Sequence, residues 1–150
     1  MEKLFKIFGF LVFGILFIGI QNIAAQSVFE TLKSNGQTSE FAAALENAGL
    51  DDRLSGNSGS FTVFAPSNNA FAQVDDKLKT DSNFLLNHII TGSATKRSLQ
   101  HMSQVTCLSG ITIEIVKMDN GSLSIENYPL EQSNIRAGNG VIHIINGVIQ

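Results

Sequence analysis

The sequence predicts an α+β fold with helices mainly in its N-terminal half and strands mainly in its C-terminal half. Two observations support this division. Between Ser27 and Leu99, apolar residues recur at helical spacing behind residues that favour helix N-caps. From Val105 to the end, apolar and polar residues alternate or form short β-branched runs between turn residues. A length of 150 residues and a hydrophobic content of 43% suit one domain with its own core.

The first 25 residues have the pattern of a signal peptide. Lys3 and Lys6 precede a charge-free run, Ile7 to Ile20, whose 14 residues would span about 21 Å as a helix. A bilayer core of about 30 Å needs a longer run, whereas a signal-peptide core of about 7–15 residues fits. Small residues up to Ala25 predict cleavage after residue 25. Cleavage after Gln26 and an uncleaved membrane anchor are the alternatives.

The remaining domain, residues 26–150, is mildly acidic. Without Glu2, Lys3 and Lys6 the net charge changes from −3 to −4. Nucleic acid requires a basic face and anionic lipid a polybasic patch, so neither partner is predicted. Membrane contact would come only from an uncleaved N-terminal segment. Cys107 is the only cysteine, so no internal disulfide forms, and we expect it to be a small buried hydrophobe.

Two helices are predicted at the start of the domain. Ser27 offers its hydroxyl as the N-cap of the first, which runs through Lys33. Ser39 caps the second, from Glu40 to Ala48, and Gly49 follows where a left-handed cap residue is needed. A short turn and a loop rich in glycine and serine lead to the first strand.

The first strand is predicted over Thr62–Ala65. Pro66 stops it, because proline cannot donate a hydrogen bond to a sheet. Ser67 then caps a short helix from which Phe71 packs back onto the strand. Further along, Asp81 caps another helix, which contains Phe84, Leu85, His88 and Ile89 on one side at helical spacing.

The strand-rich half contains a predicted hairpin. Strands over 111–117 and 122–127 are joined at Asn120-Gly121, and Asn-Gly is the strongest short-range hairpin signal. At the end of the chain, two further strands bracket Asn146-Gly147. The first of them, Val141–Ile145, is apolar on both faces, so we expect it to be a central strand.

Two segments of this pattern resemble the signature motifs of the fasciclin-type (FAS1) domain family. They are FTVFAPSNNAF at 61–71 and NGVIHIINGVI at 139–149. The resemblance covers nearly all of residues 26–150 and implies a FAS1-like β wedge of two sheets with helices from the N-terminal half. The motif positions that it carries to this chain are Phe61, Thr62, Phe64, Ala65, Pro66, Asn68, Phe71, Gly140, Val141, Ile142, His143 and Gly147.

The family's middle motif, a Tyr-His pair, is only half present. His88 matches the histidine, and Asn87 replaces the tyrosine. The family also has an acidic residue directly before an isoleucine ahead of the last motif. In this chain Asn134, which is uncharged, precedes Ile135 at that place. The resemblance associates adhesion in animal members of the family with these two regions. Because Asn87 and Asn134 alter both of them, no integrin binding is predicted. It also implies that the domain is extracellular or surface-attached and acts by binding rather than by catalysis.

No catalytic, metal or cofactor site is predicted. His88, His101 and His143 are too far apart in sequence to form a local zinc-ligand pair. The chain has no nucleophile elbow, phosphate loop or dinucleotide fingerprint. We expect His88 and His143 to support the fold through hydrogen bonds.

The sequence therefore predicts a secreted, periplasmic or cell-surface interaction or adhesion module that binds a protein or a polysaccharide. Its partner surface is expected near Asn68, Asn69 and Asn87. The alternative is a carrier of a small apolar ligand such as a lipid, or an unrecognised hydrolase, using a cavity in the wedge. A sizeable apolar pocket with convergent polar groups would favour that alternative.

Overall fold

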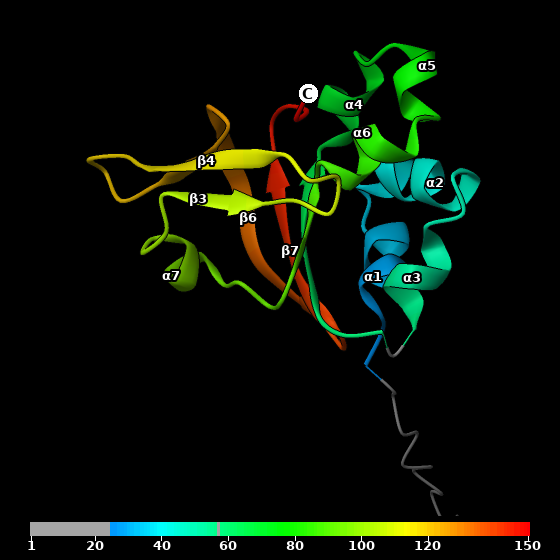
Figure 1. Ribbon diagram of the computed structural model, residues 1–150, viewed down its shortest axis with the longest axis horizontal. Coiled ribbons are helices and arrows are strands. Elements are labelled where there is room, and N and C mark those ends of the chain that lie inside the picture. The colour runs from blue at the N-terminus through cyan, green and yellow to red at the C-terminus, as the bar shows by residue number, and fades with distance from the viewer. Residues whose placement is uncertain (1–24, 57) are drawn as a thin grey trace, which may run out of the picture.

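The structure is a computed structural model that describes residues 25–56 and 58–150 (Figure 1). Almost all of the predicted signal peptide lies outside the described residues. Among the described residues, no helix combines the length and apolarity needed to span a membrane. The helices are α1 (Val28–Ser34), α2 (Ser39–Asn47), α3 (Asp51–Ser55), α4 (Asn68–Ala72), α5 (Asp76–Lys79), α6 (Ser82–Leu86) and α7 (Lys96–Leu99). The strands are β1 (Phe61–Pro66), β2 (Ile89–Thr91), β3 (Gln104–Thr106), β4 (Thr112–Lys117), β5 (Leu123–Ile125), β6 (Tyr128–Ala137) and β7 (Gly140–Ile145).

Side-chain caps begin several helices where the sequence predicts them. Ser27 forms a capping box with Glu30, which satisfies two backbone N–H groups at the start of α1. Ser67 and Asp81 accept backbone hydrogen bonds at the starts of α4 and α6. The helix after Asp81 was predicted to include His88 and Ile89, which is wrong, because α6 ends at Leu86 and Ile89 begins β2. Gly49 follows α2 with a φ of +73°, which confirms the left-handed cap.

The second helix begins differently from the prediction. Ser39 is its first residue, and Thr38 occupies the N-cap position without a side-chain cap bond. The buried Thr38 hydroxyl instead donates to the carbonyl oxygen of Leu32 at 2.8 Å. Asn68 supplies the missing acceptor, because its Oδ1 accepts the N–H of Glu40 at 3.0 Å. The cap comes from a distant segment, so the local pattern at Ser39 does not reveal it.

The strands follow one hydrogen-bonded order, β2-β1-β7-β6-β5-β4-β3. β1 and β7 are parallel, and every other neighbouring pair is antiparallel. The sheet bends over itself, so β3 and β4 lie over one side of β7 while α1 to α6 lie on the other (Figure 1). This arrangement of two facing sheet portions is the expected α+β wedge.

β1 and β7 separate two hydrophobic clusters. The first lies between the helices and the sheet and takes Val63 and Ile142 from these strands. The second lies inside the fold of the sheet and takes Phe64 and Ile145 together with residues of β4 and β5. Every residue of β1 and β7 is buried, so the predicted central position of the last apolar strand is confirmed.

The hairpin and the alternating strand before it are also confirmed. Gly121 has a φ of +81°, and the N–H of Met118 donates to the carbonyl oxygen of Ser122 at 2.8 Å. On β4, Ile113 and Ile115 are buried, whereas Thr112 and Glu114 are exposed.

The end of the chain differs from the prediction in two ways. β6 was not predicted, and its register shifts near Asn134 disrupt the simple alternation that marks a strand. Asn146-Gly147 is not a turn between strands, because residues 146–150 form no strand and Gly147 lacks a positive φ. Gly147 instead leaves room for the ring of Tyr128, which a Cβ at this position would overlap.

Candidate functional site

The two motif segments are neighbours at the centre of the sheet. β1 and β7 pair in parallel, with Phe61 opposite Gly140 and Pro66 opposite Ile145. Gly140 permits this approach, because a Cβ at this position would collide with the carbonyl oxygen of Phe61 and with Val28. The motifs are far apart in sequence but form one structural unit.

Thr62 and His143 hold the loop between β2 and α7. The Thr62 hydroxyl donates to the carbonyl oxygen of Gly92 at 2.6 Å and accepts from the N–H of Ala94 at 2.8 Å. Nε2 of His143 lies 2.7 Å from the carbonyl oxygen of Ala94, and Nδ1 accepts the N–H of Asn134 at 3.2 Å. A ring nitrogen that accepts a hydrogen bond carries no proton, so His143 is neutral and protonated on Nε2. Burial lowers its pKa and favours this neutral form.

His88 binds the C-terminal segment with the opposite tautomer. Its Nε2 accepts the N–H of Ile149 at 3.0 Å, so Nδ1 carries the proton and donates to the carbonyl oxygen of Phe84 at 3.1 Å. The rings of Phe41 and Phe84 lie 5.3 Å and 5.4 Å from the imidazole, centroid to centroid. Complete burial lowers the pKa of His88 to about 4, against the opposing effect of its backbone hydrogen bonds.

Of the three asparagines expected at a partner surface, only Asn69 is exposed. Asn87 is 9% exposed and donates from Nδ2 to the carbonyl oxygen of Ile149 at 3.2 Å, so its expected exposure is wrong. Asn68 is half-buried and, besides capping α2, donates from Nδ2 to the carbonyl oxygen of Gly36 at 2.9 Å. Both side chains form hydrogen bonds with segments distant in sequence, which the residues around them do not predict.

The remaining motif residues pack the two cores. Phe64 stacks on His143 with ring centroids 5.9 Å apart. Phe71 meets Phe41 edge to face, with centroids 5.8 Å apart. The other buried motif positions on the two strands are Ala65, Pro66, Val141 and Ile142. These positions stabilise the domain and offer no side chain to a ligand.

Sequence reasoning missed the role of Asn139. Its Oδ1 accepts the N–H of Val28 at 2.7 Å, its Nδ2 donates to the carbonyl oxygen of Leu54 at 2.8 Å, and its own carbonyl oxygen accepts the N–H of Phe61 at 3.0 Å. One residue therefore joins α1, α3 and β1. The sequence signal that could have found it is its place directly before Gly140 in the second motif.

The buried polar groups hold backbone segments together. Both nitrogens of His88 and of His143 are occupied by backbone partners, so neither ring presents a free nitrogen as base or metal ligand. Cys107 is buried as predicted, and burial together with Glu126 raises the pKa of its thiol to about 12. Within residues 25–56 and 58–150, no cluster of three His, Cys, Asp or Glu residues is placed to bind a metal ion.

Comparison with known proteins supports the resemblance of the motifs. The chain is 31% identical over 136 residues to protein sll1483 of Synechocystis, covering 84% of this chain and 74% of that protein. It is 30% identical to transforming growth factor-beta-induced protein ig-h3 of Sus scrofa, covering 83% of this chain, but it spans only 19% of that longer protein. It is 27% identical to immunogenic protein MPB70 of Mycobacterium bovis, covering 86% of this chain and 71% of that protein.

The fold is shared with a solved structure as well. A FAS1 domain pair from the insect cell adhesion molecule fasciclin I aligns with a TM-score of 0.69 and 16% identity, covering 83% of this chain and 51% of that chain. The family model described as the fasciclin domain matches residues 36–150. This match spans both motifs, α2 to α7 and the whole bent sheet, and it begins after α1. The chain therefore belongs to the fasciclin domain family.

Proposed function

We propose that this protein is a secreted or surface-associated, non-catalytic module that binds a protein or polysaccharide outside the cytoplasm. Family membership supports a role in interaction. The observation that carries the proposal is the use of the motif side chains. The polar atoms of His88, His143 and Thr62 form hydrogen bonds with internal backbone groups, so these side chains maintain the fold. A binding function therefore falls to the exposed surface.

The surface that we propose for the partner lies around Asn69 on α4. Asn69, Ala72 and Gln73 are exposed there, and α5 adds the exposed charges of Asp76 and Lys77. Uncharged amides beside acidic and basic side chains suit hydrogen bonding to a polysaccharide or to a polar protein face. The net charge of −3 for the whole chain is consistent with a partner other than nucleic acid.

Binding of the full chain to purified surface polysaccharide and, separately, to solubilised surface protein tests this proposal. We expect saturable binding to one of the two, weakened about tenfold or more by Asn69→Arg. Gln132→Arg, which adds the same charge at an exposed position on β6, is the matched control and should bind normally. Equal binding by both variants would place the partner elsewhere. Turnover of a substrate, abolished by one replacement that leaves the protein folded, would contradict the non-catalytic role.

A further inference from the structure

The bent sheet is almost a closed barrel. Its two edge strands are β2 and β3, at opposite ends of the strand order. The loop after β3 returns to β2, where the N–H of Leu108 donates to the carbonyl oxygen of Ile89 at 2.8 Å. This hydrogen bond brings the two edges together at one end of the seam between them.

Beyond the Leu108–Ile89 bond, the described part of the seam lacks the next backbone hydrogen bonds that the strand register would allow. Backbone groups alternate in direction along an antiparallel edge, so Thr91 faces the seam as Ile89 does, and Thr106 faces it as Leu108 does. Thr91 and Thr106 would form the next rung of a ladder that begins at the Leu108–Ile89 bond. Among the described residues, no backbone hydrogen bond joins these two threonines. The seam is therefore closed at one end and open at the other.

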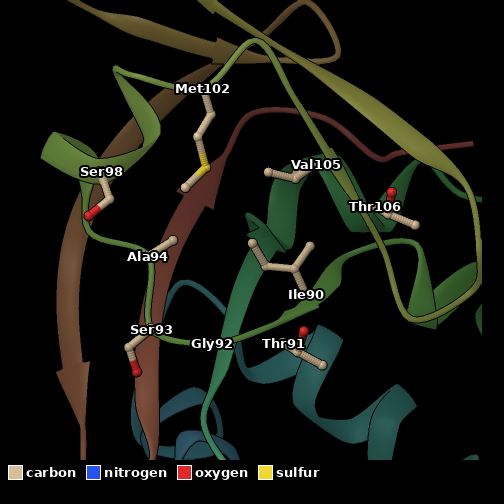
Figure 2. A pocket seen from close by; sticks show the side chains of 9 residues that line it. All are labelled: Ile90, Thr91, Gly92, Ser93, Ala94, Ser98, Met102, Val105 and Thr106. Carbon is tan, nitrogen blue, oxygen red and sulfur yellow. The ribbon is translucent and has the colours of Figure 1, made fainter.

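A cavity of about 380 Å³ occupies the open end of the seam (Figure 2). Thr91 and Thr106 line it from the two edges, and Ile90, Ala94, Met102 and Val105 supply its apolar walls. In Figure 2 the side chains of Ile90 and Val105 approach one another, and that of Met102 reaches towards Ala94. Ile90 and Ala94 also belong to the second core cluster, so this core forms part of the wall of the cavity.

We propose that this cavity binds a small, neutral, apolar molecule with an extended hydrocarbon part. A volume of about 380 Å³ is within the range of small-molecule sites and holds roughly a dozen heavy atoms. Of the described residues that line the cavity, none is ionisable, so no charged group of the ligand finds a counter-ion there. A peptide strand fits less well, because each edge strand has only three residues and the seam closes at Leu108.

Met102 is the adjustable wall of the site. It is 41% exposed although it is apolar, and its unbranched thioether chain can repack around ligands of different shape. Met118 is also 41% exposed but lies at the hairpin after β4, away from the cavity. The two methionines therefore form a matched pair of reporters for binding at the seam.

NMR of the full chain labelled with methyl-¹³C methionine tests the proposal directly. Decanol is the neutral probe, and decanoate is its charged counterpart. We expect the Met102 methyl signal to shift saturably with decanol, the Met118 signal to stay in place, and decanoate to bind about tenfold or more weakly. Equal movement of both methyl signals, or no movement of Met102, would overturn the proposal.

A pair of tryptophan variants separates binding from folding. Thr106 lines the cavity and is exposed, so Thr106→Trp should fill the mouth without disturbing the core and should weaken decanol binding about tenfold or more. Thr80, at the end of α5, is also exposed but does not line the cavity, so Thr80→Trp should bind decanol like the unchanged protein. A cooperative urea unfolding transition, followed by far-UV circular dichroism, reports whether each variant is folded. Undiminished binding by folded Thr106→Trp would contradict the site.

Discussion

Nε2 of His88 accepts the backbone N–H of Ile149 at 3.0 Å, which joins the end of α6 to the last residues of the chain. Asn87 donates to the carbonyl oxygen of the same residue, so both backbone polar groups of Ile149 are satisfied by neighbouring side chains. The Ile149 side chain, 1% exposed, is thereby held in the second core cluster. The middle and last family motifs meet at this contact.

Replacement of His88 should destabilise the domain. His88→Ala leaves the Ile149 N–H without its acceptor and removes a ring packed between phenylalanines. It also removes one of two hydrogen bonds to the Phe84 carbonyl oxygen, which still accepts the N–H of Asn87. We expect a loss of about 2–4 kcal/mol in the free energy of unfolding, measured by urea denaturation. His101→Ala, at an exposed position, should change it by less than about 0.5 kcal/mol. Equal stability of the two variants would contradict the role given to His88.

Stability should fall as the solution becomes acidic. Burial lowers the pKa of His88 from 6.5 to about 4, so between these values the unfolded chain binds more protons than the native protein. The stability that depends on neutral His88 is fully present above pH 6.5. It falls as the pH decreases through this window and is lost below about pH 4. At about 1.4 kcal/mol per unit, the loss is roughly 3 kcal/mol. The lowered pKa of buried His143 acts in the same direction.

Urea denaturation at several pH values measures this dependence. The position-specific control is His88→Gln, which cannot titrate and should show a shallower decline in unfolding free energy between pH 6.5 and about 4. The same slope in both proteins would show that other groups cause the decline.

Gly140 should not tolerate even a methyl group. A Cβ there would overlap the Phe61 carbonyl oxygen on the paired strand, and backbone cannot move aside as a flexible side chain can. Gly140→Ala should cost about 2 kcal/mol or more, or prevent folding. Gly36→Ala is the matched control, because a Cβ there meets no atom within 4 Å. Thermal unfolding of both variants decides the matter, and similar melting temperatures would contradict the close approach of the two motifs.

The stability of the domain should depend on the left-handed backbone conformation of Asn134. It has a φ of +60° in the irregular part of β6, and its Oδ1 accepts the N–H of Lys96 at 2.8 Å. Asn134→Ala removes this hydrogen bond and disfavours the left-handed backbone conformation. We therefore expect a loss of about 1–3 kcal/mol in the free energy of unfolding, measured by urea denaturation. Asn134→Gly loses only the bond and should be the milder change. A glycine variant as unstable as the alanine variant would rule out backbone strain as the cause.

Export with removal of residues 1–25 stays a prediction of the sequence. Protein recovered from the medium or periplasm should be lighter than the 16.2 kDa chain and should begin at Gln26, or at Ser27 for the alternative cut. Intact-mass measurement distinguishes these forms. Full-length chain held in a membrane would favour the anchor instead.

The elements predicted correctly are those with local signals. Ser27, Ser67 and Asp81 mark helix starts through their own side chains, and Asn120-Gly121 marks a hairpin through its own backbone preference. The apolar character of β1 and β7 likewise follows from burial on both faces. Local chemistry alone fixes these features, so one sequence is enough to find them.

The features that were missed depend on contacts between distant segments. Asn87 looks like a surface residue at a helix end, and only the arrival of Ile149 buries it. Gly147 follows asparagine as a turn glycine does, but it is small because Tyr128 packs on it. The cavity also requires the bent sheet to bring β2 and β3 together, and no short sequence pattern encodes that meeting. Such contacts follow from topology rather than from composition.

The central claim is that the motif histidines are neutral structural residues fixed in opposite tautomers. Long-range ¹H–¹⁵N NMR of the imidazole rings in the full chain tests it most directly, because the ¹⁵N shifts distinguish both tautomers and the charged form. At neutral pH we expect the proton on Nδ1 of His88 and on Nε2 of His143. The His88 ring should stay neutral as the solution is acidified to pH 6, because burial lowers its pKa to about 4. A charged ring at either position, or the same tautomer at both, would contradict the account.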